Sequence, residues 1–202
     1  ERYRNEELSF FVEQVFNRQD RQVVLVDLLQ ALTKGESVFT DQRQALDLIV
    51  GHTLYAKQNR LVNALSPRVS KVVFACSKAD QVLSADHDDL RQLLFEVVKT
   101  TYEKASVEGV SPICEAIAAI RSSNEIDHRG QTVLAGHALQ SGEQLGYVNP
   151  GIATHIPDTE AQWAAYTSWQ YKPLAPPTCS LHKALPHIRI DSVINHLLED
   201  LL

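Results

Sequence analysis

Three short, mostly apolar runs, each followed by polar residues, constrain the fold of this chain most strongly. The runs are Val23–Val26, Val72–Cys76 and Ile113–Ile120. A strand that is apolar on both faces must be covered on both faces, which is typical of a parallel sheet between helices. The alternation of strand and helix therefore predicts an α/β fold with a parallel sheet and flanking helices. Such sheets bind ligands at the carboxyl ends of their strands.

The segments around these runs carry apolar residues at the spacing of amphipathic helices. Capping residues, glycine and proline indicate where each helix begins and ends. The predicted bounds are residues 7–16 for the first helix, Thr40-Asp41 to Ser66-Pro67 for the second, after a loop at Lys34-Gly35, and Ser84 or Asp86 to Gly109 for the third.

The pattern changes at Asn124, after which glycine and proline recur. The segment Asp127-His128-Arg129-Gly130 predicts a hairpin turn, and Thr132–Leu134 predicts the strand after it. We therefore divide the chain into residues 1–123, which hold the parallel sheet, and an irregular extension over residues 124–202.

The extension is expected to pack on the sheet domain through its aromatic side chains, since these bury a large area each. They are Trp163, Tyr166, Trp169 and Tyr171. A terminal helix is predicted to begin with Asp191 as its cap.

The charge balance limits the partners that the chain can bind. A net charge of −6 and a pI near 5.7 argue against nonspecific binding of nucleic acid, which needs a surplus of Lys and Arg. No run approaches the roughly 18 apolar residues that a membrane-spanning helix requires. The three cysteines, Cys76, Cys114 and Cys179, form no Cys-x-x-Cys pair and predict reduced thiols in a cytoplasmic protein. Because the sequence starts at Glu1 and contains no methionine, we expect it to be part of a longer protein.

The segment Ser77-Lys78-Ala79-Asp80, at the end of the second apolar run, fits the [N/T/S]KxD pattern with which GTP-binding proteins read guanine. A carboxylate at Asp80 accepts hydrogen bonds from guanine N1–H and from the exocyclic amino group, each worth roughly 1.5–3 kcal/mol. Adenine would leave this carboxylate buried and unpaired. The Lys78 side chain is expected to lie across the plane of the base, and the hydroxyl of Ser77 replaces the usual Asn only in part.

A second base-contacting element is expected at Ala118, Ala119 and Ile120, one helix and one strand later, where backbone N–H groups would meet guanine O6. The usual Ser-Ala-Lys is absent. Since this contact is made by backbone, the small residues are compatible with it, but an ordinary strand end explains them equally well.

Two aspartates, Asp27 and Asp127, lie in segments that match other elements of nucleotide-binding proteins. Asp27 follows the first apolar run and could face a nucleotide or cap a turn. Asp127 begins a DxxG match, but this match follows the guanine-reading segment, whereas a magnesium switch precedes it, so a turn is the better interpretation. No G-x-x-x-x-G-K-[S/T] occurs, and the eight histidines lack metal-ligand spacing, so we predict no metal site and assign no catalytic residue.

With these residues identified, the chain resembles the YcjX family of stress-inducible bacterial P-loop GTPases over essentially its whole length. Three strings carry the resemblance: Asp20-Arg21-Gln22-Val23-Val24-Leu25-Val26-Asp27, Phe74-Ala75-Cys76-Ser77-Lys78-Ala79-Asp80 and Leu185-Pro186-His187-Ile188-Arg189-Ile190-Asp191. The departures are Ser77, where members of the family can carry Thr, and Ile120-Arg121, which match no strong motif.

The resemblance implies that residues 1–123 are the carboxy-terminal part of a GTPase domain. It also implies GTP and GDP as ligands, Mg²⁺ and a phosphate loop held by residues upstream of Glu1, and GTP hydrolysis by the whole protein. A stress-linked role near the inner membrane, beside a membrane-protein partner, is implied in the same way. The alternative is a non-catalytic interaction module with degenerate nucleotide binding, whose extension would expose an apolar patch around Trp163 to Tyr171.

Overall fold

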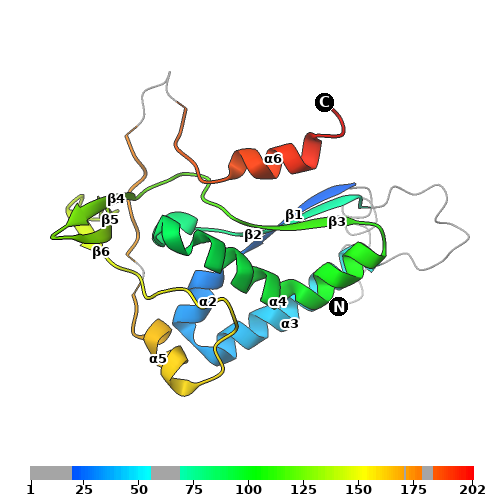
Figure 1. Cartoon of the computed structure of the whole chain (residues 1–202), viewed down its shortest axis with the longest axis horizontal. Helices are drawn as coiled ribbons and strands as arrows, with labels where there is room; N and C mark the ends of the chain where they lie inside the picture. Colours follow the sequence, from blue (N-terminus) through cyan, green and yellow to red (C-terminus); the bar gives the residue numbers. More distant parts are fainter. Residues whose placement is uncertain (1–19, 56–68, 171, 179–183) are drawn as a thin grey trace, which may run out of the picture.

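The computed structural model describes residues 20–55, 69–170, 172–178 and 184–202 (Figure 1). The predicted helix over residues 7–16, the predicted helix end at Ser66-Pro67, and Tyr171 and Cys179 lie outside these ranges.

A parallel sheet forms the centre of the molecule, as predicted. Its strands are β1 (Arg21–Val26), β2 (Lys71–Cys76) and β3 (Ser111–Ala116), in the order β1-β2-β3. All six residues of β2 are buried, because this strand is covered on both faces and paired on both edges.

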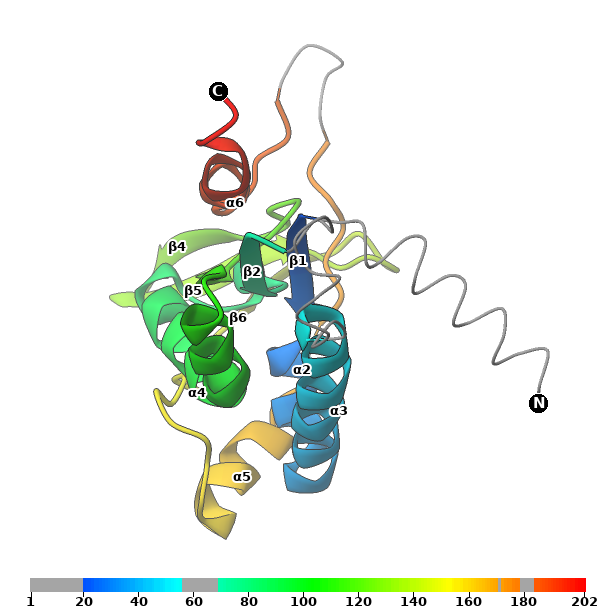
Figure 2. The ribbon, with the colours of Figure 1, turned by 90° about the vertical axis from the view of Figure 1, so that its right-hand side faces the viewer.

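Helices cover both faces of this sheet (Figures 1 and 2). On one face lie α2 (Leu28–Lys34), α3 (Glu36–Tyr55), α4 (His87–Val107) and α5 (Glu160–Thr167), and on the other lies α6 (Ile190–Leu198). The alternation of side chains along β2 divides the core accordingly. Phe74 packs in the cluster of the first face, whereas Val73 and Ala75 pack with Val193 of α6. The fold class is therefore α/β, as the sequence predicted.

The predicted helix start at Thr40-Asp41 is wrong, because these residues lie inside α3. The segment before them is a separate helix, α2, which the sequence analysis missed. Asp27 caps α2 by accepting a hydrogen bond from the N–H of Gln30 at 3.2 Å. Gly35, at φ 93°, ends α2 and lets α3 start at the next residue.

Two other predicted boundaries also differ, and one predicted cap lacks its hydrogen bond. The third strand ends at Ala116 rather than Ile120, because the chain leaves the sheet to pair with Ile188. Asp191 lies in the first turn of α6, whose cap position is held by Arg189 with a left-handed backbone. Asp86 precedes α4 as predicted, but its side chain makes no capping hydrogen bond there.

A second sheet, antiparallel, opens the extension with β4 (Asn124–His128), β5 (Gln131–His137) and β6 (Gln144–Tyr147). The predicted turn lies between β4 and β5. There Gly130, at φ 81°, donates its N–H to the carboxylate of Asp127 at 3.0 Å. Asp127, near the end of β4, thus stabilises the turn with its side chain, which confirms the interpretation of the DxxG match as a turn.

Aromatic residues anchor the rest of the extension, as expected. Trp163 and Tyr166 on α5 are 7% and 4% exposed and belong to the main core, and Trp169 packs against it. Trp163 meets the ring of Phe39 on α3 edge to face, with centroids 5.4 Å apart.

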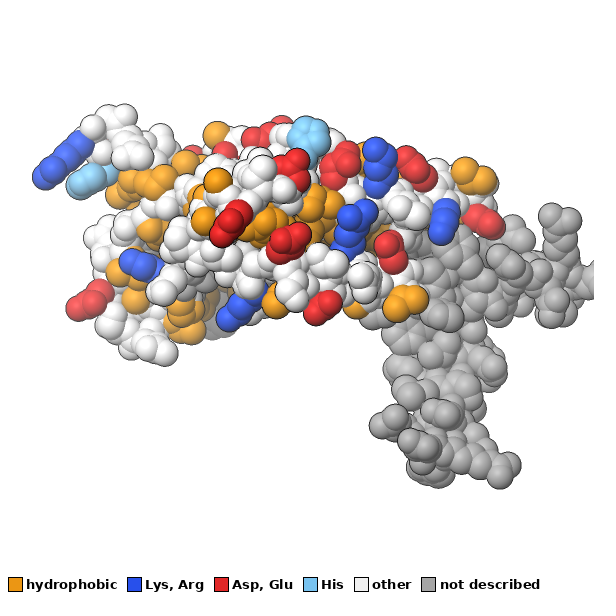
Figure 3. All heavy atoms as spheres, turned by 90° about the horizontal axis from the view of Figure 1, so that it is seen from below, with side chains coloured by type: hydrophobic (Ala, Val, Ile, Leu, Met, Phe, Trp, Pro, Cys, Tyr) orange, Lys and Arg blue, Asp and Glu red, His pale blue; other side chains and the backbone are white. Residues whose placement is uncertain are grey.

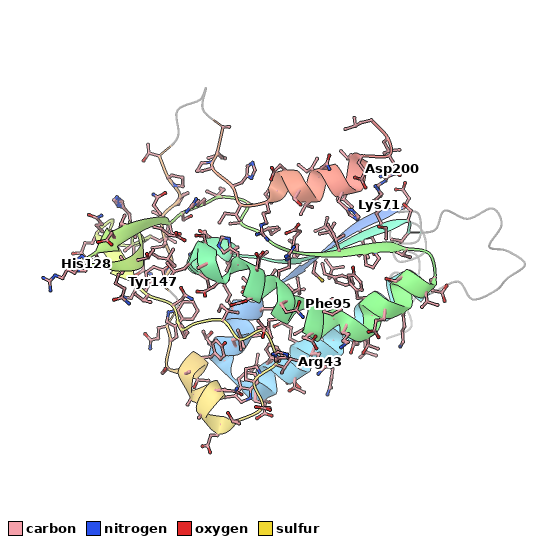
Figure 4. All side chains as sticks on the ribbon, viewed as in Figure 1. Arg43, Lys71, Phe95, His128, Tyr147 and Asp200 are labelled. Atoms are coloured by element: carbon pink, nitrogen blue, oxygen red, sulfur yellow. The ribbon has the colours of Figure 1, made fainter. Side chains whose placement is uncertain are left out.

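Ion pairs and hydrogen bonds connect the carboxyl end of α6 to the first residues of β1 and β2. Lys71 and Arg21 lie 2.9 Å and 2.7 Å from the carboxylate of Asp200, and Lys71 also donates to the carbonyl oxygen of His196 at 2.6 Å. Figure 4 shows Lys71 and Asp200 together at this end of the helix. The cations thus bind both a carboxylate and the negative end of the helix dipole.

We expect the contribution of Asp200 to stability to be lost in acid. Its hydrogen bonds with Arg21 and Lys71 hold the pKa of this carboxyl well below its ordinary value of 3.8, so the stabilisation is present above about pH 4 and fades as the pH falls further. Asp200→Asn should lower the thermal midpoint at pH 7, and the difference from the unmodified protein should shrink at pH 3. Asp191→Asn, at an exposed position in the first turn of α6, is the control. An Asp200→Asn effect that is equal at both pH values would contradict this assignment.

The surface is mixed in charge. On the face seen in Figure 3, Lys and Arg side chains of the described residues are interspersed with Asp and Glu. None of the helices in the described part of the chain has the length and apolar character needed to cross a membrane. Cys76 and Cys114 are free thiols, and burial raises the pKa of each to about 12, which keeps them protonated and unreactive.

Candidate functional site

The loops that follow the three strands of the parallel sheet meet at one edge. Asp27 follows β1, Ser77 follows β2, and Ile117 begins the turn after β3. The backbone ties these segments together, because Ser77 donates its N–H to Val26 at 3.0 Å and Ile117 donates to Cys76 at 2.8 Å. This edge is where a parallel sheet offers a ligand site.

Lys78 has a left-handed backbone, with φ 65°, directly after Ser77. Its ammonium lies 2.5 Å from the carboxylate of Asp27 and is about half exposed. Asp27 therefore does two things at once: one oxygen caps α2, and the other holds Lys78 at the strand edge. Of the two roles left open for Asp27, the structure shows the cap and adds the ion pair.

Asp80 lies in a short 3₁₀ turn, Ala79–Gln81, and is 6% exposed. Its carboxylate accepts a hydrogen bond from the N–H of Ser122 at 2.9 Å. Ser123 donates its hydroxyl to the backbone oxygen of Asp80. Burial raises the pKa of the Asp80 carboxyl, whereas the bond from Ser122 and the charge of Arg121 lower it. Any additional N–H donor would favour the charged form further.

The turn after β3 is joined to the Asp80 segment by its backbone. Ala79 donates to Ile117 at 2.9 Å, next to the bond from Ser122 to Asp80. The predicted base-contacting residues differ in exposure: Ala118 is buried, whereas Ala119 and Ile120 are exposed.

The string that carries the family resemblance packs directly on this turn. Ile188 exchanges two hydrogen bonds with Ala118, at 3.1 and 2.9 Å, and Pro186 accepts the N–H of Arg121 at 2.7 Å. The N–H of Ala118 is therefore engaged within the protein. Backbone N–H groups that could bind a ligand must therefore come from the residues of the turn after Ala118.

Several residues beside Asp80 were missed from the sequence. Ser122 and Ser123 bond to Asp80 directly, and buried His87 lies with Nε2 2.9 Å from the oxygen of Ala79. Burial lowers the pKa of His87, so its neutral form is favoured. Ser122 and Ser123 carry no sequence signal apart from following the predicted turn, and His87 looks like any histidine at the start of a helix.

The arrangement can accept hydrogen bonds from the polar edge of a ring and cover its face. It offers a buried carboxylate acceptor, a cation on an apolar stem, and a backbone turn beside them. Among the described residues, no group of three or more His, Cys, Asp or Glu side chains is placed to hold a metal ion.

Comparison with known proteins agrees with the resemblance noted in the sequence. The model of the YcjX-like family, DUF463, matches residues 1–202. The chain is 31% identical over 196 residues to the "Ras-like GTPase YcjX" of Escherichia coli K12, and 29% identical over 201 residues to the protein of the same name from Shewanella oneidensis MR-1. Each match covers 95% of this chain but only 42% and 41% of the relative, so the chain spans about two fifths of their length. The chain belongs to the YcjX-like family.

Proposed function

We propose that this chain is the guanine-binding portion of a GTP-binding and GTP-hydrolysing protein. The observation that carries the proposal is the buried Asp80 carboxylate, held at the carboxyl edge of the sheet by the N–H of Ser122. The printed names of the relatives, Ras-like GTPase, support the same conclusion.

In this proposal Asp80 accepts hydrogen bonds from guanine N1–H and from the 2-amino group. The bond from Ser122 occupies one lone pair of one oxygen and leaves capacity for both. Since the carboxylate is already desolvated by the protein, a base that cannot donate to it gains nothing from the site.

The remaining base contacts come from both sides of Asp80. Lys78 covers one face of the ring with its methylene stem, and its ion pair with Asp27 keeps the ammonium at this edge. Ser77 supports the loop, Ala119 and Ile120 offer backbone donors to O6, and Ala118 anchors that turn through Ile188.

Phosphate and magnesium are handled elsewhere in this proposal. Mg²⁺ and the phosphates would be held by residues preceding this chain in a longer protein, as the family resemblance implies and as the two-fifths coverage of the relatives allows. Residues 1–123 would complete a GTPase domain with them, and residues 124–202 would pack on it. A stress-linked role and a membrane-protein partner rest on the family resemblance alone, whereas a cytoplasmic location rests on the cysteines.

The proposal is tested by titrating the full-length protein with GDP, IDP and ADP in a calorimeter. We expect GDP to bind most tightly. IDP lacks the 2-amino group and should lose about tenfold or more, and ADP, which presents neither donor to Asp80, should lose at least about a hundredfold. Equal affinities for the three nucleotides would contradict the proposal.

The alternative, an interaction module with degenerate nucleotide binding, needs an exposed apolar patch around Trp163 to Tyr171. Trp163 and Tyr166 are buried in the core, which removes most of that surface. A thermal melt of the full-length protein that no nucleotide shifts would favour the module.

A further inference from the structure

The segment that joins Asp80 to α4 has little regular structure of its own. It consists of two short 3₁₀ turns, Ala79–Gln81 and Ser84–Asp86, separated by Val82 and Leu83. Short 3₁₀ turns have poorer hydrogen-bond geometry than α-helix, so their conformation depends on outside contacts. What surrounds this segment therefore decides where the Asp80 carboxylate lies.

The second sheet supplies those contacts at successive points. Tyr147, at the end of β6, donates its hydroxyl to Gln81 at 2.9 Å. Glu125, on β4, accepts the backbone N–H of Ser84 and, at 3.0 Å, its hydroxyl. The bond with the Ser84 backbone lowers the pKa of the Glu125 carboxyl, which stays charged. Tyr147, labelled in Figure 4, lies on the side of this sheet nearest the start of α4, whereas His128 marks its far tip.

Asn149, two residues beyond β6, makes the most complete set of bonds. It is 5% exposed, accepts the N–H of Leu83 at 3.1 Å, and donates to the carboxylate of Asp86 at 2.8 Å and to the carbonyl oxygen of Pro150 at 2.8 Å. One buried amide thus ties Leu83, just before the second 3₁₀ turn, to Asp86, the last residue of that turn.

The same sheet also approaches Ser122, which bonds to the Asp80 carboxylate. A methyl group added to Gly136 of β5 would lie 2.9 Å from Cδ1 of Leu174 and 2.9 Å from the carbonyl oxygen of Ser122, the residue whose N–H holds the Asp80 carboxylate. Only glycine lets β5 approach this closely. Gly146 of β6 has no such neighbour, since its nearest atom would be 4.0 Å away.

We propose that the sheet β4–β6 is a clamp that sets how Asp80 reads the base, with Asn149, Tyr147 and Glu125 as its positioning residues. The inference rests on the proposed guanine site and names what controls its specificity. The clamp forms hydrogen bonds with four residues of the segment after Asp80, namely Gln81, Leu83, Ser84 and Asp86. At Gly136 it also lies close to Ser122, which donates its N–H to Asp80. A carboxylate that must meet two donors of a rigid ring tolerates little displacement, so loosening the clamp costs selectivity.

The test compares GDP with IDP, because these ligands differ only in the 2-amino group that Asp80 is proposed to accept. The ratio of their affinities reports the placement of the carboxylate, whereas a general loss of folding or of phosphate binding affects both nucleotides equally. The measurement uses the full-length protein carrying Asn149→Ala or Gly136→Ala. The matched controls are Asn124→Ala, at an exposed position of β4, and Gly146→Ala, where there is room for the methyl group.

We expect both clamp variants to reduce the GDP-to-IDP ratio about threefold or more, against about tenfold for complete loss of the amino contact. The two controls should keep the ratio of the unmodified protein. If Asn149→Ala does not fold, Tyr147→Phe removes only the hydroxyl that binds Gln81 and is expected to reduce the ratio in the same direction.

Two outcomes overturn the inference, and they are distinguishable. A preference for GDP in the unmodified protein that survives unchanged in the clamp variants shows that the sheet does not position Asp80. An unmodified protein without a preference for GDP removes the guanine site itself, and with it the role of the clamp.

Discussion

Asp80→Ala should lower the affinity of the full-length protein for GDP at least about a hundredfold without lowering the affinity for ADP. The carboxylate is proposed to accept two hydrogen bonds from guanine, each worth roughly 1.5–3 kcal/mol, and every 1.4 kcal/mol is a factor of about ten. Adenine makes neither hydrogen bond, so removing the carboxylate does not weaken the binding of ADP. Isothermal titration with both nucleotides measures the change.

The control for this substitution is Asp89→Ala, which removes a carboxylate from the first turn of α4 without touching the proposed site. It should leave both affinities as they are. A GDP affinity for Asp80→Ala within about threefold of the unmodified value, far short of one lost charge-assisted bond, would exclude Asp80 as the base-reading residue.

The second large effect is expected on stability. Phe74, in the middle of β2, is fully buried and packs in the cluster shared with α2, α4 and α5. Phe74→Ala should lower the free energy of unfolding by about 3–5 kcal/mol, because it loses the transfer free energy of the ring and leaves a cavity. Chemical denaturation followed by circular dichroism measures the difference.

Leu48→Ala provides the comparison, since Leu48 on α3 is 65% exposed. It should change the free energy of unfolding by less than about 0.5 kcal/mol. Similar losses for Phe74→Ala and Leu48→Ala would mean that the sheet is not buried between the helices as described.

The parallel sheet could be predicted because its strands carry their own signal. The run Val72–Cys76 is apolar on both faces, and only a covered central strand needs that pattern. Helix α2 was missed because it is short: seven residues between Asp27 and Gly35 contain too few turns for periodicity, and Leu28-Leu29 suits a loop or a helix equally well. The sequence did single out Asp27, the cap of α2, but allowed it either to cap a turn or to face a nucleotide.

The position of Asp80 could be proposed from its place after a strand, but its surroundings could not. The residue that holds its carboxylate, Ser122, is 42 positions away along the chain. Asn149 is 63 positions from Asp86. Such pairs arise from tertiary packing, which no local propensity encodes.

The string Leu185–Asp191 has a physical role that only the structure shows. The sequence alone linked this string to the family but did not indicate what its residues contact. In the structure, Ile188 and Pro186 bond to the turn at Ala118–Arg121, and Arg189 pairs with Asp88 at the start of α4 and with Glu115 on β3. The string therefore braces the turn of the proposed base site and leads into α6.

The most direct test of the guanine assignment is the affinity of Asp80→Asn for GDP and for XDP, the xanthine nucleotide. Xanthine carries an oxygen where guanine carries the 2-amino group, so an amide side chain can accept from N1–H and donate to that oxygen, whereas it opposes the guanine amino group. We predict that the unmodified protein prefers GDP and that Asp80→Asn prefers XDP, with the ratio of affinities changed by at least about a hundredfold. A variant that retains the original preference for GDP would contradict the assignment of Asp80 as the residue that reads the base.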